Sequence, residues 1–430
     1  MSSPGLPPST PASPPPAAER WRLARLLTAP HRLGFFAAAA LMAASAAWWA
    51  VALALQASGI ALPWAVARPL AHSLAMAFSF MPLFIVGFAF TAGPRWLGLP
   101  DVPAPSLLRP VLAMGGGWGL AVIGFHFAAP LAAAGIALAA GGWTVVLRRF
   151  ARLIAASPMP DRMHARGVLA AGIVGACAMA LAALALALAW PDLGRAAVRL
   201  AIWGFLAATF AVVSHRMLPF FTVSALPFVK AWKPDWLLGA ILVALGTSAL
   251  ADAAELLWWP LPAAVHAGMA VLQGAAAALM LWVAWRWGLV PSMRVRLLAM
   301  LHAAFVWLGL ALALAAWSHA RMALLGDAAS LGLAPLHALT IGYLGATLIA
   351  MITRVAAGHS GKPLAADDLA LVLYLAVHAA AALRVAASLW PAAGDALTLA
   401  AVAAWALGCI GWALRYGNWL GRPRADGRPG

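Results

Sequence analysis

The sequence predicts an all-α, polytopic membrane protein of about twelve transmembrane helices, with both termini in the cytoplasm. Of its 430 residues, 65% are hydrophobic and only 9% are charged, whereas soluble domains carry roughly 25% charged residues. The apolar residues form runs of about 20, the length that crosses the hydrocarbon core of a bilayer. Lys and Arg gather in alternate loops, as the positive-inside rule requires. Together these features exclude a soluble enzyme.

Twelve apolar runs are separated by prolines, glycines and charged clusters, which interrupt helices. The first run begins at Gly34. It is too long for the apolar core of a signal peptide and lacks a convincing cleavage site, so we expect it to remain as the first helix. The predicted spans are residues 34–55, 70–93, 109–126, 128–147, 166–189, 196–217, 235–253, 262–285, 296–317, 333–353, 367–389 and 395–415.

The basic residues orient these spans. With the N-terminus in the cytoplasm, the cytoplasmic segments hold 23 of the 28 Lys and Arg residues. The outer segments hold only Arg68, Arg195, Arg199, Arg321 and Arg384. This asymmetry explains the net charge of +16 as a topology signal, and a nucleic-acid partner is therefore not expected.

The domain organisation follows from the same pattern. Residues 1–33 are predicted to form a cytoplasmic tail, whose Ser-, Pro- and Ala-rich part is expected to be disordered. Residues 34–418 form a single transmembrane domain with membrane lipid as its surroundings. Residues 419–430 form a basic cytoplasmic tail.

Cysteines and carboxylates offer little chemistry within the spans. Cys177 and Cys409 lie in separate apolar runs and form no CxxC pair, which argues against disulfides and thiolate metal centres. Asp252 and Glu255 lie at an outer helix end, where they are best explained as helix-end charges. A carrier that depends on an intramembrane carboxylate is therefore only weakly supported.

The 11 histidines are the polar residues that enter the spans. His72, His266 and His337 each lie a few residues into a span that runs inward, so they share a level in the outer leaflet. Ionisable groups within a membrane are functional candidates by default, and imidazole ligates both haem iron and copper. For a single histidine at a helix end, contact with lipid headgroups is the better explanation. For three histidines at one depth on separate helices, a metal site and headgroup contact explain the pattern about equally well.

Other candidates lie nearer the cytoplasm. His302 lies inside the ninth span and His215 at the cytoplasmic border, and either would serve as a metal ligand. Arg354 and His359 flank the cytoplasmic end of the tenth span and would suit an anion or a haem propionate. That assignment requires a second site, because the other candidates lie in the outer leaflet. The remaining histidines include His31 and His164, which are expected to be loop residues.

Three segments resemble a known family. Leu336–Leu364 reads LHALTIGYLGATLIAMITRVAAGHSGKPL and is similar to the NnrS signature, a HALT-x-G helix followed by M-x-TRV-x-x-GH-[ST]-G-[RK]-PL. His215–Thr222, HRMLPFFT, is similar to the family turn R-x-x-PFFT. His72–Gly98 begins HSLAM and ends GFAFTAGPRWLG, which resembles an HxHEM stretch leading to GF-x-x-TA-x-x-NW-x-G. With fainter matches, the resemblance runs from the second span to the eleventh, in the family's order.

The resemblance implies a protein of the bacterial inner membrane that contains b-type haem and copper. It also implies a link to nitric oxide metabolism and protection from nitrosative stress, with nitric oxide or another small diatomic molecule as ligand. The sequence identifies no electron donor, oligomeric state or catalytic turnover. The residues that match family positions are His72, Arg216, His302, His337, Arg354 and His359.

This chain also departs from the family pattern. Leu74 and Ala75 stand where the family has the second His and the Glu of HxHEM, and Arg95 replaces an Asn. If that His is a metal ligand in the family, one metal site is lost or rebuilt here. His215 and His266 are the candidate substitutes.

Three functions compete. The first is a haem protein that meets nitric oxide in the membrane, with His72 and His337 as ligands near the outer leaflet. The alternative is a transporter for a metal, haem or small solute with a His-lined path, hinted at by the similar stretches PLAHSL and PLHALT. A haem–copper oxidase or nitric oxide reductase subunit is disfavoured. Such proteins carry closely spaced histidines, and no two histidines here are one or two residues apart.

Overall fold

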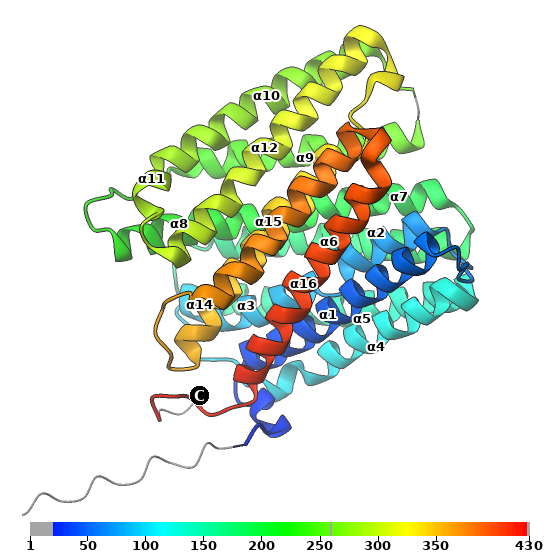
Figure 1. The fold of residues 1–430 in the computed structure, drawn as a ribbon. Coiled ribbons are helices and arrows are strands. Elements are labelled where there is room, and N and C mark those ends of the chain that lie inside the picture. Colours follow the sequence, from blue (N-terminus) through cyan, green and yellow to red (C-terminus); the bar gives the residue numbers. More distant parts are fainter. Residues whose placement is uncertain (1–19, 259, 428–430) are drawn as a thin grey trace, which may run out of the picture.

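The computed structural model describes residues 20–258 and 260–427, and within them it contains helices and no strands. Twelve of these helical segments are long and apolar enough to cross a membrane, which confirms the predicted bundle. The disorder predicted for the first residues of the N-terminal tail lies outside the described part. Figure 1 shows the long helices running side by side.

Nine spans are each formed by one continuous helix, except that the last opens with a short 3₁₀ turn. They are α1 (Pro30–Ala57), α4 (Pro105–Phe127), α5 (Ala129–Ala156), α6 (Met163–Ala187), α9 (Asp235–Leu257), α10 (Ala263–Arg286), α12 (Arg296–Leu325), α15 (Asp368–Leu389) and η5–α16 (Pro391–Ala393 and Gly394–Leu420). Shorter elements outside the spans are η1 (Leu23–Leu27), α11 (Leu289–Ser292) and η3 (Asp327–Ala329).

The other three spans are irregular near their middle. The second span breaks at Ser79–Phe80 into α2 (Arg68–Phe78) and α3 (Met81–Trp96). The remaining two contain a π-helix, a rare form that is frequent at functional sites. The sixth span consists of α7 (Pro191–Leu200), the π-helix η2 (Ala201–Ala207) and α8 (Ala208–Ala225), and the tenth of α13 (Ala334–His337), the π-helix η4 (Ala338–Gly345) and α14 (Ala346–His359).

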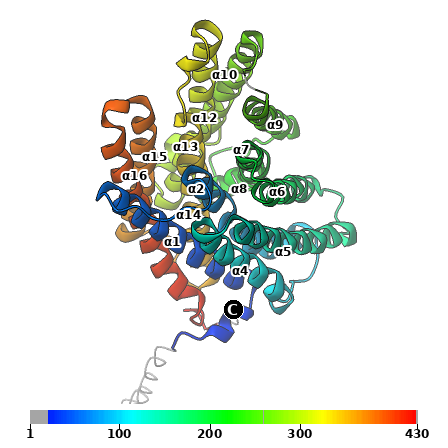
Figure 2. The same cartoon turned by 90° about the vertical axis from the view of Figure 1, so that its right-hand side faces the viewer.

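These three irregular spans form the core of the bundle. In their most apolar 18-residue windows, 83%, 72% and 78% of the residues are buried, against 33% to 61% in the other nine spans. Figure 2 shows α2, α8, α13 and α14 near the middle, with α4, α5, α6, α9, α10, α15 and α16 around them. We refer to the second, sixth and tenth spans as the core spans. The surrounding helices therefore shield the irregular backbone from lipid, which an exposed membrane helix would not tolerate.

Small residues let an outer helix approach a core span closely. At Gly34 of α1, an added Cβ would lie 2.6 Å from the Cα of Gly87 in α3. Glycine at such a crossing lets two backbones come together in a membrane. The crossing fixes α1 against the second half of that span, α3.

The two ends of the described chain meet at one face of the bundle (Figure 1). The Arg32 guanidinium donates hydrogen bonds to the carbonyl oxygens of Leu420 at 2.8 Å and Arg422 at 2.7 Å. The Arg22 amide donates to the Gly421 carbonyl at 2.9 Å. An even number of crossings requires this placement of both ends on the same side. That this side is the cytoplasm stays a prediction from the basic loops.

The Gly34–Gly87 crossing generates a test of packing. Gly34→Ala is expected to destabilise the protein by about 1–3 kcal/mol, because the new methyl group overlaps the α3 backbone. Gly116→Ala is the control: Gly116 is exposed on α4 and an added Cβ there meets nothing within 4 Å. Thermal unfolding of both purified variants in detergent is the measurement, and equal midpoints would contradict the packing account.

Orientation can be tested at the C-terminus. A fluorescent protein that matures only in the cytoplasm, fused after the last residue, should fluoresce, because twelve crossings and the basic loops place that end inside. Alkaline phosphatase fused at the same position should be inactive. The reverse pattern would show that the bundle is inverted.

Candidate functional site

Two histidines of the core spans lie at the start of their helices. His72 is the fifth residue of α2, three residues after Pro69, and His337 lies in α13, two residues after Pro335. Proline at the first helical positions is favourable, since its fixed backbone angle suits a helix and its missing N–H is not needed there. Both imidazoles are thereby held at the same end of neighbouring core spans.

The hydrogen bonding of His337 leaves one nitrogen available. Its Nδ1 lies 2.9 Å from the carbonyl oxygen of Leu333. A carbonyl oxygen only accepts, so Nδ1 donates and a neutral ring has an unprotonated Nε2. This is the arrangement that orients metal-ligating histidines, whose second nitrogen donates to a backbone carbonyl.

His72 is held by stacking rather than by hydrogen bonds. Its ring lies on Trp49 of α1, with centroids 4.0 Å apart and planes at 21°. Its Nδ1 is buried and has no hydrogen-bond partner among the described residues. A buried polar nitrogen without a partner is costly, and a bound group would remove that cost.

Positive charge surrounds this pair of histidines. His72 and His337 interact electrostatically with each other and with Arg384 of α15. Arg199 of α7 also acts on His337. The Arg384 guanidinium donates to the Ser388 hydroxyl at 3.0 Å and so remains on its own helix. The site therefore offers two imidazoles and a cation that suits a carboxylate.

His266 does not join this pair, although the sequence predicts all three at one level. Its Nδ1 lies 2.9 Å from the Nδ1 of His319 on α12, and its Nε2 lies 3.4 Å from Asp327. His319 lines a cavity of about 240 Å³ with Arg199, Glu255 and residues of the segment that carries His337. The predicted equal depth therefore did not identify the partner of His266, which is His319.

Two further pairs lie toward the other face. His164 Nε2 is 3.0 Å from His215 Nδ1, and the rings of His31 and His359 are 4.2 Å apart. The prediction that His31 and His164 are loop residues is wrong: they are 3% and 2% exposed, within α1 and α6. These helices begin at Pro30 and Met163, a few residues earlier than predicted. For α1 the sequence contained a signal for this earlier start, because Pro30 is a proline and proline favours the first turn of a helix.

The remaining candidates are bound within the protein. His302 Nε2 lies 2.9 Å from the Thr222 hydroxyl. The Arg354 guanidinium lies 4.2 Å from the ring centre of Phe221. His359 interacts electrostatically with several arginines, among them Arg95. Lys362, which shares the loop of His359, lies over Trp419 instead. Arg354 and Lys362 are thus engaged by rings on different helices.

In residues 20–258 and 260–427, no group of three or more His, Cys, Asp or Glu side chains is arranged to hold a metal ion. The histidines form pairs instead. Two imidazoles are too few for a protein-built metal shell, but they suffice where the cofactor brings most of its own ligands. A haem does so, since its porphyrin supplies four nitrogens and the protein supplies one or two axial ligands.

Sequence reasoning missed two members of the site formed by His72 and His337, which we call the outer site because the basic loops predict that this end of the bundle faces outward. Nothing in the sequence singles out Trp49, because its contact with His72 depends on how α1 packs. Arg384 counted only as one of the few basic residues outside. The sequence did contain a signal for Arg384: an arginine in a segment predicted to lie outside is unusual under the positive-inside rule.

One comparison with known proteins identifies a family. The family model described as NnrS protein matches residues 25–424. No relative among curated proteins matches the chain. The match extends from the basic N-terminal segment to the C-terminal tail, so it covers every span and both histidines of the outer site.

Proposed function

Because the chain belongs to the NnrS family, we propose that it is a haem-binding protein of the bacterial inner membrane that meets nitric oxide and contributes to nitrosative-stress protection. The observation that best supports this proposal is the outer pair, His72 and His337, which lie on two core spans. The Leu333 carbonyl fixes His337 with Nε2 free, while His72 has a buried nitrogen without a partner.

The residues present fit a haem. His72 and His337 would hold the haem iron, and the Arg384 guanidinium would suit a propionate, since arginine binds carboxylates with strong charge-assisted hydrogen bonds. When bound, the haem supplies redox chemistry and an iron that takes up diatomic ligands. The protein orients the imidazoles through Leu333 and Trp49 and excludes bulk water through the surrounding helices.

The residues present do not fit a copper centre of the kind that the family resemblance implies. Leu74 and Ala75 stand where the family stretch has its second His and its Glu, and both are fully buried in the hydrophobic core. No group of three His, Cys, Asp or Glu side chains converges elsewhere in the described chain. We therefore assign haem, and no copper, to this member of the family.

A carrier remains the second candidate because two core spans are alike. Each has a π-helix followed by Ala-Thr and, seven residues after the threonine, an arginine: Thr209 and Arg216, Thr347 and Arg354. Internal repeats are typical of transporters. Uptake of a metal or solute into vesicles by haem-free protein would favour this function.

The haem assignment is tested by spectroscopy and single histidine variants. A reduced-minus-oxidised spectrum of the purified protein should be b-type and should shift when nitric oxide is added. His337→Ala and His72→Ala should lower the haem content, because each removes an imidazole proposed to hold the iron.

His126→Ala is the matched control. His126 also lies at an outer helix end, but its Nε2 accepts from Trp48 at 2.8 Å and its Nδ1 lies 2.8 Å from the Pro63 carbonyl. Its haem content should stay unchanged. Full haem in His337→Ala, or equal loss in His126→Ala, would sink the assignment. A colourless protein from haem-replete cells would favour the carrier.

Arg384 generates a separate prediction. Arg384→Gln should retain haem but lower its reduction potential by tens of millivolts, because a nearby positive charge favours the reduced state. For a one-electron couple, about 59 mV corresponds to a tenfold change in the equilibrium. Arg321→Gln is the control, since this outer arginine donates to the Ala329 carbonyl at 2.8 Å. Equal potentials in both variants would place the haem away from Arg384.

A further inference from the structure

The cavity of about 240 Å³ beside the outer site has a polar wall that the haem assignment does not use. It lies among α7, α9, α12 and residues 330–336. Leu333, whose carbonyl oxygen holds His337, lines it. Arg199 and Asp252 also line it, and their side chains remain 23% and 19% exposed. A polar cavity of this size has room for several water molecules. We call it the polar cavity.

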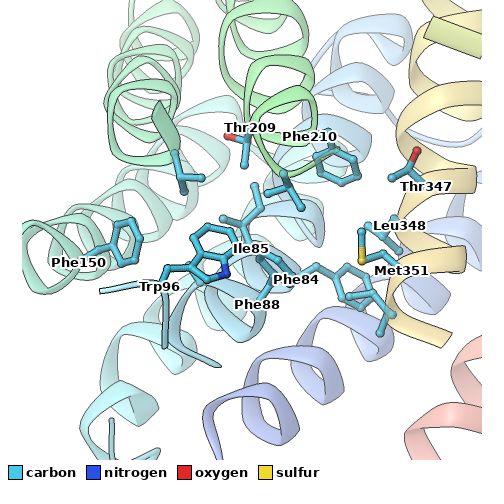
Figure 3. Close-up of a pocket in the computed structure, with 14 residues that line it drawn as sticks. Phe84, Ile85, Phe88, Trp96, Phe150, Thr209, Phe210, Thr347, Leu348 and Met351 are labelled. Atoms are coloured by element: carbon cyan, nitrogen blue, oxygen red, sulfur yellow. The ribbon is translucent and has the colours of Figure 1, made fainter. Parts of the chain in front are cut away.

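A second cavity, of about 50 Å³ among α3, α8 and α14, differs in its wall (Figure 3). Phe84, Phe210 and Met351 are among its lining residues, of which none is charged and none is a histidine. It therefore contains no acid or base. Of these two cavities, the polar one alone offers groups that exchange protons with water.

The charges that line the polar cavity do not balance. The Asp252 carboxylate accepts a hydrogen bond from Trp203 Nε1 at 2.9 Å and lies 3.6 Å from the Arg199 guanidinium. Glu255 follows Asp252 by three residues and so shares its face of α9. It is half-buried and makes no hydrogen bond or ion pair within residues 20–258 and 260–427. One arginine thus faces two carboxylates. An unpaired carboxylate in such a place is costly, and a bound proton would remove that cost.

The other titratable groups near Glu255 do not neutralise it. His319 of α12 lines the cavity, but its Nδ1 is engaged by His266 of α10 at 2.9 Å. His266 Nε2 in turn lies 3.4 Å from Asp327. The charged groups that act on Glu255 in the described chain are Asp252, Arg199 and Asp327. Two of these three are negative, so the surroundings add to the excess of negative charge.

We propose that Glu255 is a proton-binding residue of the polar cavity, and that its proton balances the charge of an electron that enters the outer site. Arg199 links the two places, because it acts electrostatically on both Glu255 and His337. A carboxylate oxygen of Glu255 forms an O–H bond with a proton taken from cavity water, while the electron comes from an external one-electron donor. The coupling to the outer site rests on the proposed function; the proton site does not.

Infrared spectroscopy tests the proton site without any haem. Near neutral pH, haem-free full-length protein in detergent should show the C=O stretch of a protonated carboxyl group, and this band should disappear as the pH is raised. Glu255→Gln should remove the band, because an amide cannot bind the proton. Asp192→Asn is the control and should keep it, since Asp192 is an exposed carboxylate paired with Arg195 at the start of α7. Absence of the band in the unchanged protein, or its persistence in folded Glu255→Gln, would overturn the proton site.

A redox titration tests the coupling. In the haem-loaded protein the reduction potential should fall as the pH rises, because the proton at Glu255 favours the reduced state. Glu255→Gln should lose this slope and hold the potential that the unchanged protein reaches at low pH, since glutamine is uncharged like the protonated carboxyl group. Asp192→Asn should retain the slope. A slope that persists in Glu255→Gln would show that the coupling is wrong. If the protein holds no haem but Glu255→Gln loses the infrared band, the proposed function and the coupling fail while the proton site stands.

Discussion

The structure depends on one constraint: polar backbone and side-chain groups in a bilayer must be satisfied or shielded from lipid. Nine spans meet lipid with regular helices, whose backbone bonds are internal. The three core spans are the places where this regularity is broken, at Ser79–Phe80 and in the two π-helices. They are also the most buried spans. The surrounding helices therefore create an interior in which irregular backbone and ionisable side chains are tolerated.

Within that interior the histidines behave as a set. Eight of the 11 form four pairs, each joining two different spans. In the pairs of His164 with His215 and of His266 with His319, ring nitrogens are used to bind one another. The outer pair differs from these two. His337 uses one nitrogen to bond the Leu333 carbonyl, and the His72 ring is held by stacking on Trp49. Availability of the nitrogens, more than depth in the membrane, separates a ligand from a structural histidine.

The sequence was sufficient for those features that depend on one span at a time. Span number follows from hydropathy, and the common depth of His72 and His337 follows from their place in inward-running helices. The angular position around the bundle depends on how helices pack, so His319 could not be matched to His266. The π-helices have no comparable signal, since HALTIGYLG reads as an ordinary apolar stretch. Burial of His164 likewise required knowing that α6 begins earlier than its apolar run.

The replacement of two polar family residues by Leu74 and Ala75 has a consequence for selectivity. A centre rich in protein donors captures free metal ions, because several ligands converge on one point. With buried apolar side chains at these positions, the outer site retains two imidazoles that do not converge with a third donor. Such a pair holds a metal firmly only when another molecule supplies the remaining ligands, as porphyrin does. Under the proposed function, the retained pair of imidazoles would therefore bind haem in preference to a free metal ion.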